Sequence, residues 1–228
     1  MNKGRTVSEL RWPDTPDFVD EIKKWQADAI KRLVEIIWAA YDNYYREVLS
    51  VIDISEADEE LERSITQDLA LKMDDILTGF EPFCVQHERY EVETRRDPPA
   101  RSPQCDIAFV LRNNPRIMWP LEAKVLRSER TVAEYVKEIQ DNYLTCRKSP
   151  FSSQAGMLGY LLSGDPEIAF QNISTRLGCT LAKHPDLMRR NHRVSDHQRA
   201  IPTGKSYPHS FQCHHLMLEL IPKPRKAQ

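Results

Sequence analysis

Two short apolar segments joined by a turn constrain the fold of this chain more than any other feature. Residues 105–111 read Cys-Asp-Ile-Ala-Phe-Val-Leu, and residues 117–125 form a second, mostly apolar run. Between them, Asn113, Asn114 and Pro115 are residues that favour a turn. Apolar runs of strand length on either side of a turn predict a β-hairpin, and therefore a sheet with buried strands.

The N-terminal part of the chain has helical periodicity instead. Apolar residues recur at steps of three to five within residues 17–50, where neither Gly nor Pro occurs, and this pattern predicts one long helix. A second helix is predicted to begin at the N-cap Ser55, with Asp58 three residues later, and to close at Gly79. The chain therefore opens with two helices.

The remaining elements alternate between helix and strand. A helix is predicted over 131–144, and another over 167–177 because Asp165 and Pro166 suit a helix start. Strands are predicted over 83–93, 155–162 and 211–221, and loops over 97–103 and 183–208.

This order predicts a mixed α/β domain built on one central sheet. With 228 residues, 40% of them hydrophobic, the chain can bury a sizeable core. The expected division is a helical appendage over 1–54 followed by one domain over 55–228.

The net charge of -2 is an average of two very different halves. Residues 1–94 hold 11 basic and 22 acidic side chains, whereas residues 95–228 hold 21 basic and 12 acidic ones, giving -11 and +9. The basic half predicts a polyanionic partner such as nucleic acid. The acidic half leaves open a homodimer contact or a larger protein partner.

The cysteines indicate a reduced protein. There are five of them, widely spaced and without a CxxC pair, and no run of 18 apolar residues exists in the chain. The acidic start of the sequence does not fit a secretion signal. We expect a cytoplasmic protein without a membrane span.

Three residues of the hairpin carry the chemistry. Glu122 and Lys124 are two positions apart, so they project from the same face of their strand, and Asp106 is expected opposite Glu122. Burying two carboxylates beside apolar residues costs several kcal/mol per ion unless a cation compensates. Oxygen ligands from Asp106, Glu122 and the Ala123 carbonyl suit Mg²⁺ or Mn²⁺, and Lys124 would stand beside a metal-bound water.

These residues resemble the motif of the PD-(D/E)xK nuclease superfamily, which has the restriction-endonuclease-like fold. The resemblance rests on Asp106, on Glu122-Ala123-Lys124 sixteen residues later, and on the order of elements over roughly 55–180. It implies that Asp106 and Glu122 bind the metal and that Lys124 acts as the water-positioning base. It also implies a helix glutamate, for which Glu62 is the best match and Glu59 a weaker one. The proline that often precedes the aspartate is replaced by Cys105.

The resemblance implies an Mg²⁺-dependent endonuclease that hydrolyses DNA phosphodiester bonds, in a restriction or phage-defence system. The alternative is a catalytically silent subunit that keeps the nuclease fold and binds a partner or nucleic acid. RNA as the substrate would use the same chemistry, and residue types alone do not separate the two polymers. No known DNA-reading module is present.

Basic and histidine residues outside the motif are candidates for contacts with phosphates. Six of the seven histidines lie between 184 and 215, without the close ligand pairs that zinc sites use, and we interpret them as loop histidines. Arginines flank the hairpin and fill the predicted loop, where a polyanion could contact them. The candidates are Arg101, Arg127, Arg130, Arg193, His197 and Arg199.

Overall fold

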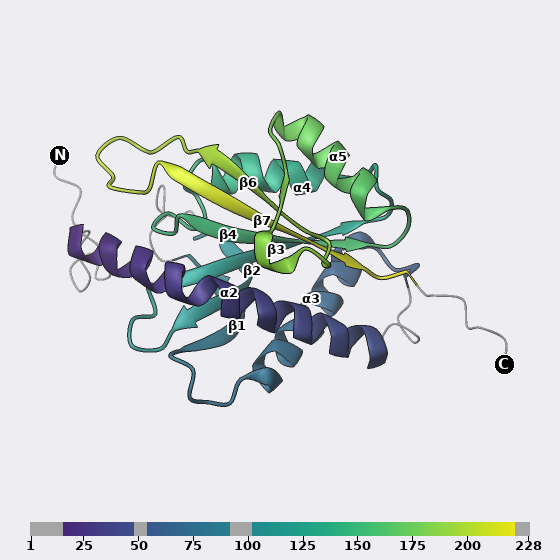
Figure 1. Cartoon of the computed structure of the whole chain (residues 1–228), viewed down its shortest axis with the longest axis horizontal. Helices are drawn as coiled ribbons and strands as arrows, with labels where there is room; N and C mark the ends of the chain where they lie inside the picture. Colours follow the sequence, from purple (N-terminus) through teal and green to yellow (C-terminus); the bar gives the residue numbers. More distant parts are fainter. Residues whose placement is uncertain (1–15, 48–53, 92–101, 222–228) are drawn as a thin grey trace.

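The computed structural model describes residues 16–47, 54–91 and 102–221. They form a seven-stranded mixed sheet with helices on both faces, which agrees with the predicted α/β class (Figure 1). The sheet order is β1-β2-β3-β4-β7-β6-β5. The strands are β1 (Phe83–Tyr90), β2 (Gln104–Leu111), β3 (Met118–Leu126), β4 (Gln154–Leu161), β5 (Ala182–Lys183), β6 (His192–Gln198) and β7 (Ser210–Glu219).

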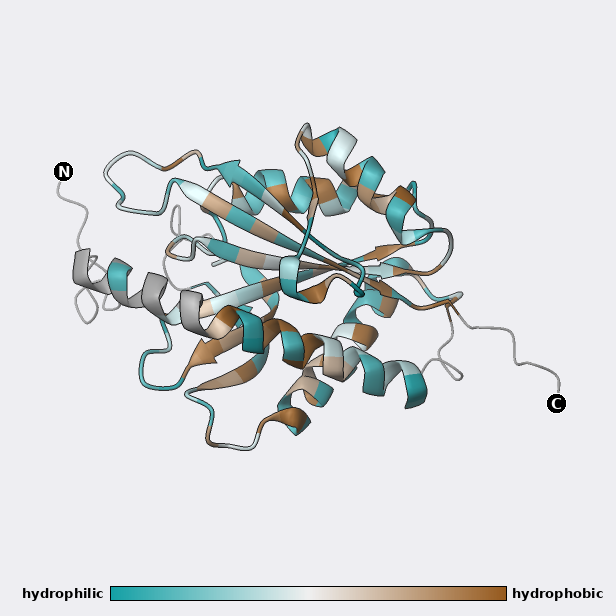
Figure 2. Ribbon diagram, viewed as in Figure 1, coloured by the Kyte–Doolittle hydropathy of each residue, from teal (hydrophilic) through white to brown (hydrophobic). Residues whose placement is uncertain are grey.

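Two helices cover each face of the sheet. Helices α2 (Pro16–Glu47) and α3 (Asp58–Ile76) lie on one face, and α4 (Ala133–Glu138) and α5 (Pro166–Leu177) lie on the other (Figure 1). Figure 2 shows hydrophobic residues gathered where helices and strands meet. No helix in the described part of the chain combines the length and the apolar character that crossing a bilayer would take.

Helix α2 is part of the main core. Leu33, Ile36 and Ile37 are fully buried in the same cluster as residues of α3 and of β2, β3, β4 and β7. The Tyr41 hydroxyl donates to the carbonyl of Glu219, at the end of β7, over 2.8 Å. The predicted helix over 17–50 is therefore confirmed as far as residue 47, and its apolar face packs into the core of the domain. Residues 48–50 lie outside the described residues.

Helix α3 begins later than the sequence suggests. Its N-cap is Ala57, without a side-chain hydrogen bond, so the prediction of Ser55 as the cap is wrong. Three acidic residues in the first turn, Asp58, Glu59 and Glu60, interact favourably with the positive end of the helix dipole instead. The helix ends at Ile76, three residues before Gly79, which has a positive φ of 86°.

The hairpin of β2 and β3 is confirmed, and its register is the expected one. Ile107 pairs with Leu121 and Val110 with Met118, so Asp106 and Glu122 follow as the next opposing positions. Strand β4 is confirmed too, despite its glycines. A Cβ added to Gly156 would collide with the side chains of Leu121 and Trp119, so this glycine lets β3 and β4 pack closely.

Two other predictions need correction. The helix predicted over 131–144 is α-helical only over α4 and continues as a π-helix, η1 (Ile139–Tyr143). The loop predicted over 183–208 contains a short 3-10 helix, η2 (Pro185–Leu187), and strand β6. The sequence pattern does not predict strand β6 because this strand is polar. It nevertheless pairs with β7 from His192 to Gln198. Most of the proline-rich segment 97–103 lies outside the described residues.

Candidate metal and nucleic-acid site

The site forms where β2 and β3 separate. Their pairing stops at Ile107 and Leu121, whereas β3 stays paired with β4 as far as Leu126. Beyond this point, β3 exposes backbone groups on the side that β2 has left. A sheet edge opened inside a protein needs other partners for those groups.

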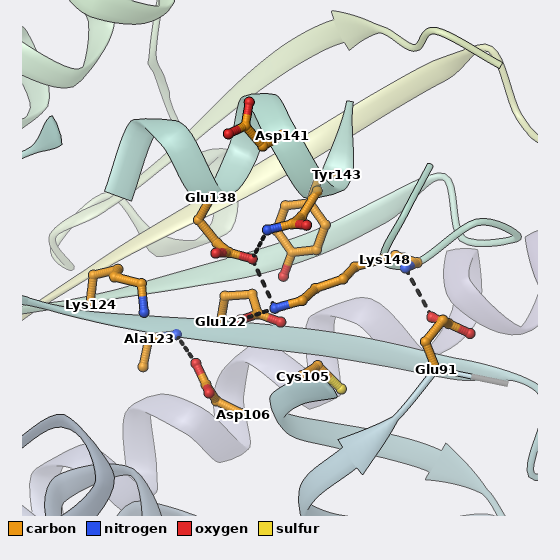
Figure 3. Close-up of polar contacts among 12 residues, drawn as sticks. Glu91, Cys105, Asp106, Glu122, Ala123, Lys124, Glu138, Asp141, Tyr143 and Lys148 are labelled. Atoms are coloured by element: carbon orange, nitrogen blue, oxygen red, sulfur yellow. Dashed lines mark hydrogen bonds and ion pairs between the residues drawn. The ribbon is translucent and has the colours of Figure 1, made fainter. Parts of the chain in front are cut away.

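Two carboxylates supply these partners. Asp106 Oδ2 accepts the Ala123 N–H over 2.7 Å, and Glu62 Oε2 accepts the Val125 N–H over 3.2 Å (Figure 3 shows the first contact). Because the N–H and C=O of one strand residue point toward the same neighbour, the Ala123 carbonyl also faces this open edge. The structure thus brings Asp106, Glu62 and Ala123 together, as the sequence predicts, whereas Glu59 is exposed.

Glu122 is the most deeply buried carboxylate of the group. Its side chain is 2% exposed, and one oxygen, Oε2, contacts the Lys148 amine over 2.7 Å. The other oxygen, Oε1, is buried without a hydrogen-bond partner among the described residues. Burial, and next the charge of Asp106, raise the pKa of Glu122 well above its ordinary value. A buried oxygen with no partner beside a second carboxylate is a position that a cation would stabilise.

Lys124 forms an ion pair with the helix glutamate. Its amine donates to Glu62 Oε1 over 2.6 Å, with both side chains less than a quarter exposed. Burial alone would lower the pKa of Lys124, but the charges of Glu62, Asp106 and Glu122 raise it overall. Burial raises the pKa of Glu62, although the Lys124 charge opposes this shift. The amine is therefore a fixed positive charge at neutral pH.

Sequence reasoning missed two members of the site. Lys148 ends between Glu122 and Glu138 in Figure 3, with its amine 2.8 Å from Glu138 Oε1. Glu138 falls on the polar side of its predicted helix, a position that normally faces solvent, and here it is 15% exposed. Lys148 lies in an irregular segment, so no periodicity in the sequence could place it.

Two of the six predicted phosphate contacts are buried. Arg193 and Arg199 are each 5% exposed. Arg193 pairs with Glu167, and the guanidinium of Arg199 donates to backbone carbonyls. Both arginines therefore have structural roles in this fold, and the prediction that they contact phosphate is wrong.

The other candidates differ in exposure. Arg127 pairs with Asp58, and half-buried His197 shares a hydrogen bond with Ser195. Arg130 is exposed, and Arg101 lies outside the described residues. Of the described members of this group, Arg130 is the side chain best placed to meet a polyanion.

Four of the six clustered histidines lie on strands, so for these the interpretation as loop residues is wrong, whereas His184 and His209 do lie outside helices and strands. His192, His214 and His215 are buried on β6 and β7. His214 Nε2 donates to the Gln154 side-chain oxygen over 2.9 Å, so its Nδ1 accepts from His192 Nε2 over 3.1 Å. Within the described residues, no group of three or more His, Cys, Asp or Glu side chains is arranged to hold a metal ion as it stands.

The buried histidines predict a strong loss of stability in acid. Burial lowers the pKa of His192 to about 2 and those of His214 and His215 to about 3. In the unfolded chain a histidine has a pKa of about 6.5. As the pH falls below that value the unfolded state takes up protons that the folded state does not, so the folded state loses stability.

We expect the free energy of unfolding, measured with urea, to fall by about 1 kcal/mol or more per pH unit below pH 6. Replacing His214 by Gln should reduce this slope. His209→Gln, at an exposed position, is the matched control and should leave it unchanged. Equal stability at pH 7 and pH 5 would contradict the assignment of neutral, buried histidines.

No family model, no curated protein and no solved structure matches this chain.

Proposed function

We propose that the protein is a metal-dependent nuclease of the PD-(D/E)xK type, which hydrolyses DNA phosphodiester bonds in a restriction or phage-defence system. The fold we infer for it is restriction-endonuclease-like. The observation that carries this proposal is Glu122, whose buried, unpartnered oxygen lies next to the charge of Asp106 at the open edge of β3. Buried like charges are costly, and such arrangements concentrate at functional sites.

The donor set fits Mg²⁺ or Mn²⁺. Asp106, the free oxygen of Glu122 and the Ala123 carbonyl would hold the ion, all of them hard oxygen ligands. Glu62 would complete or orient this set from α3. A bound divalent ion would polarise a phosphoryl oxygen and lower the pKa of a water molecule.

Side chains of the protein would position the attacking water and the metal ligands. The Lys124 ammonium, oriented by Glu62, would place the attacking water and stabilise the charge that develops on the phosphate. The buried carboxylate of Glu122 would keep its position because Lys148 holds its second oxygen. Fixed donors and charges of this kind need no rearrangement during the reaction.

A catalytically silent subunit with the same fold is the second candidate. It is favoured by the internal partners of each carboxylate: Asp106 accepts a backbone N–H, Glu62 binds Lys124 and Glu122 binds Lys148. In this form the acidic groups are already compensated within the chain. The nuclease proposal therefore requires that a divalent ion displaces or adds to these contacts.

Cleavage by the purified wild-type protein tests the two candidates directly. We expect Mg²⁺ or Mn²⁺ to support cutting of DNA, with the activity abolished by EDTA. Supercoiled plasmid, linear duplex, single-stranded DNA and single-stranded RNA should be compared, because RNA uses the same chemistry. The protein should be tested alone and with the products of neighbouring genes. If neither metal supports cleavage of any of these polymers, the protein is the catalytically silent subunit.

A further inference from the structure

The Lys148 amine is a cation enclosed by two carboxylates. It lies 2.7 Å from Glu122 Oε2 and 2.8 Å from Glu138 Oε1, and only 11% of the side chain is exposed. Asn142 donates to the same Glu138 oxygen over 2.6 Å, which fixes that carboxylate from η1. Figure 3 shows the extended lysine side chain reaching this position from a separate segment of the chain.

The segment that carries Lys148, residues 144–153, is held firmly in place; we call it the Lys148 loop. The Arg199 guanidinium donates to five backbone carbonyls at its start and along it, those of Tyr143, Lys148, Ser149, Pro150 and Ser152. In addition, Glu91 accepts the Ser149 N–H over 3.0 Å.

The Lys148 loop also contains backbone strain. Cys146 and Ser149 have positive φ values of 57° and 55°, in the left-handed region that side chains other than glycine rarely adopt. Strained residues persist where surrounding contacts over-determine them, often beside a functional group. A lysine that only solubilised the surface would need neither the clamp nor the strain.

We infer that the Lys148 ammonium is a built-in cation that occupies the place of a second divalent ion between Glu122 and Glu138, so that the site binds one metal ion per chain. This inference rests on the proposed metal site. Pairs of divalent ions in phosphoryl-transfer sites are bridged by shared carboxylates. Glu122 has one oxygen on Lys148 and one open oxygen, so it can join the ammonium to a single ion on the Asp106 side.

Counting bound Mn²⁺ by calorimetry and by electron paramagnetic resonance tests this inference. Wild type should bind one ion per chain. Lys148→Ala removes the charge and opens the space, and it should bind two. Lys148→Met removes the charge but fills the space, so it should still bind one. In the double variant Lys148→Ala/Glu138→Gln, the second ion loses a ligand and the count should return to one.

The outcomes separate the inference from the proposed function. If wild type binds no ion, the metal site itself is wrong. If wild type binds one ion and Lys148→Ala also binds one, the metal site stands and only the role of Lys148 is wrong. Two ions bound to wild type would also show that the role of Lys148 is wrong.

Should Lys148→Ala be unfolded without metal, two equivalents of Mn²⁺ should restore the wild-type circular dichroism spectrum, because the second ion replaces the missing charge. Failure of both Lys148→Ala and Lys148→Ser to recover in Mn²⁺ would also overturn the inference.

Discussion

Replacing Asp106 by Asn or Glu122 by Gln is expected to reduce metal-dependent DNA cleavage by about 10³-fold or more. Each change removes one charged ligand, and a metal ion supplies several kcal/mol of transition-state stabilisation. The amide variants are preferable to alanine, because an Asn oxygen at position 106 can still accept the Ala123 N–H. An alanine at this position would leave that N–H unpaired, at a cost of about 1 to 3 kcal/mol.

Thermal unfolding of the same variants shows whether a loss of cleavage reflects a loss of catalysis or a loss of folded protein. Glu122→Gln removes a buried charge that Asp106 opposes and keeps an amide oxygen that can accept from the Lys148 amine, so the melting temperature of the metal-free protein should change little. Glu134→Gln, at a side chain that is 74% exposed on α4, is the matched control and should keep full activity. Amide variants that cleave within tenfold of wild type would rule out both carboxylates as metal ligands.

Replacing Arg199 by Ala is expected to lower the free energy of unfolding by about 3 kcal/mol or more. Arg199 is 5% exposed, and its guanidinium lies over the Phe211 ring, 4.5 Å from the ring centroid, in addition to its bonds with the Lys148 loop. Its loss leaves several buried carbonyls without a donor. Urea denaturation at pH 7 measures the change.

Arg176→Ala provides the comparison, because Arg176 is exposed on α5 and should cost less than about 0.5 kcal/mol. The Arg199 variant should also cleave DNA more slowly than wild type under conditions where it is fully folded, because the Lys148 loop would no longer be fixed. A loss of less than 1 kcal/mol would show that other contacts hold this loop.

The sequence predicts the hairpin and its register well because both depend on local patterns. Apolar runs of strand length flank a turn, and the count of residues from Asn113 and Asn114 places Asp106 opposite Glu122. Glu62 could be placed because its helix has a regular apolar face, marked by Leu61 and Ile65. These elements are specified by residues close to one another in the chain.

What the sequence does not predict depends on partners that are distant in the chain. Strand β6 is polar, and it forms because β7 offers it an edge for pairing. Lys148 gains its position from Arg199, about fifty residues later, and from Glu91, nearly sixty residues earlier. Tertiary contacts of this range leave no periodic signal in the sequence.

The place of β7 in the sheet has a consequence for biosynthesis. Residues 210–219 pair with both β4 and β6, so β7 joins the two parts of the sheet. Until the ribosome has synthesised β7, the edge of β4 that pairs with β7 has no partner, and the nascent chain exposes an apolar strand. Unpaired edges of this kind are prone to aggregation. We therefore expect the sheet to be completed only after β7 has been synthesised, and chaperones that shield exposed strands before then would raise the yield of folded protein.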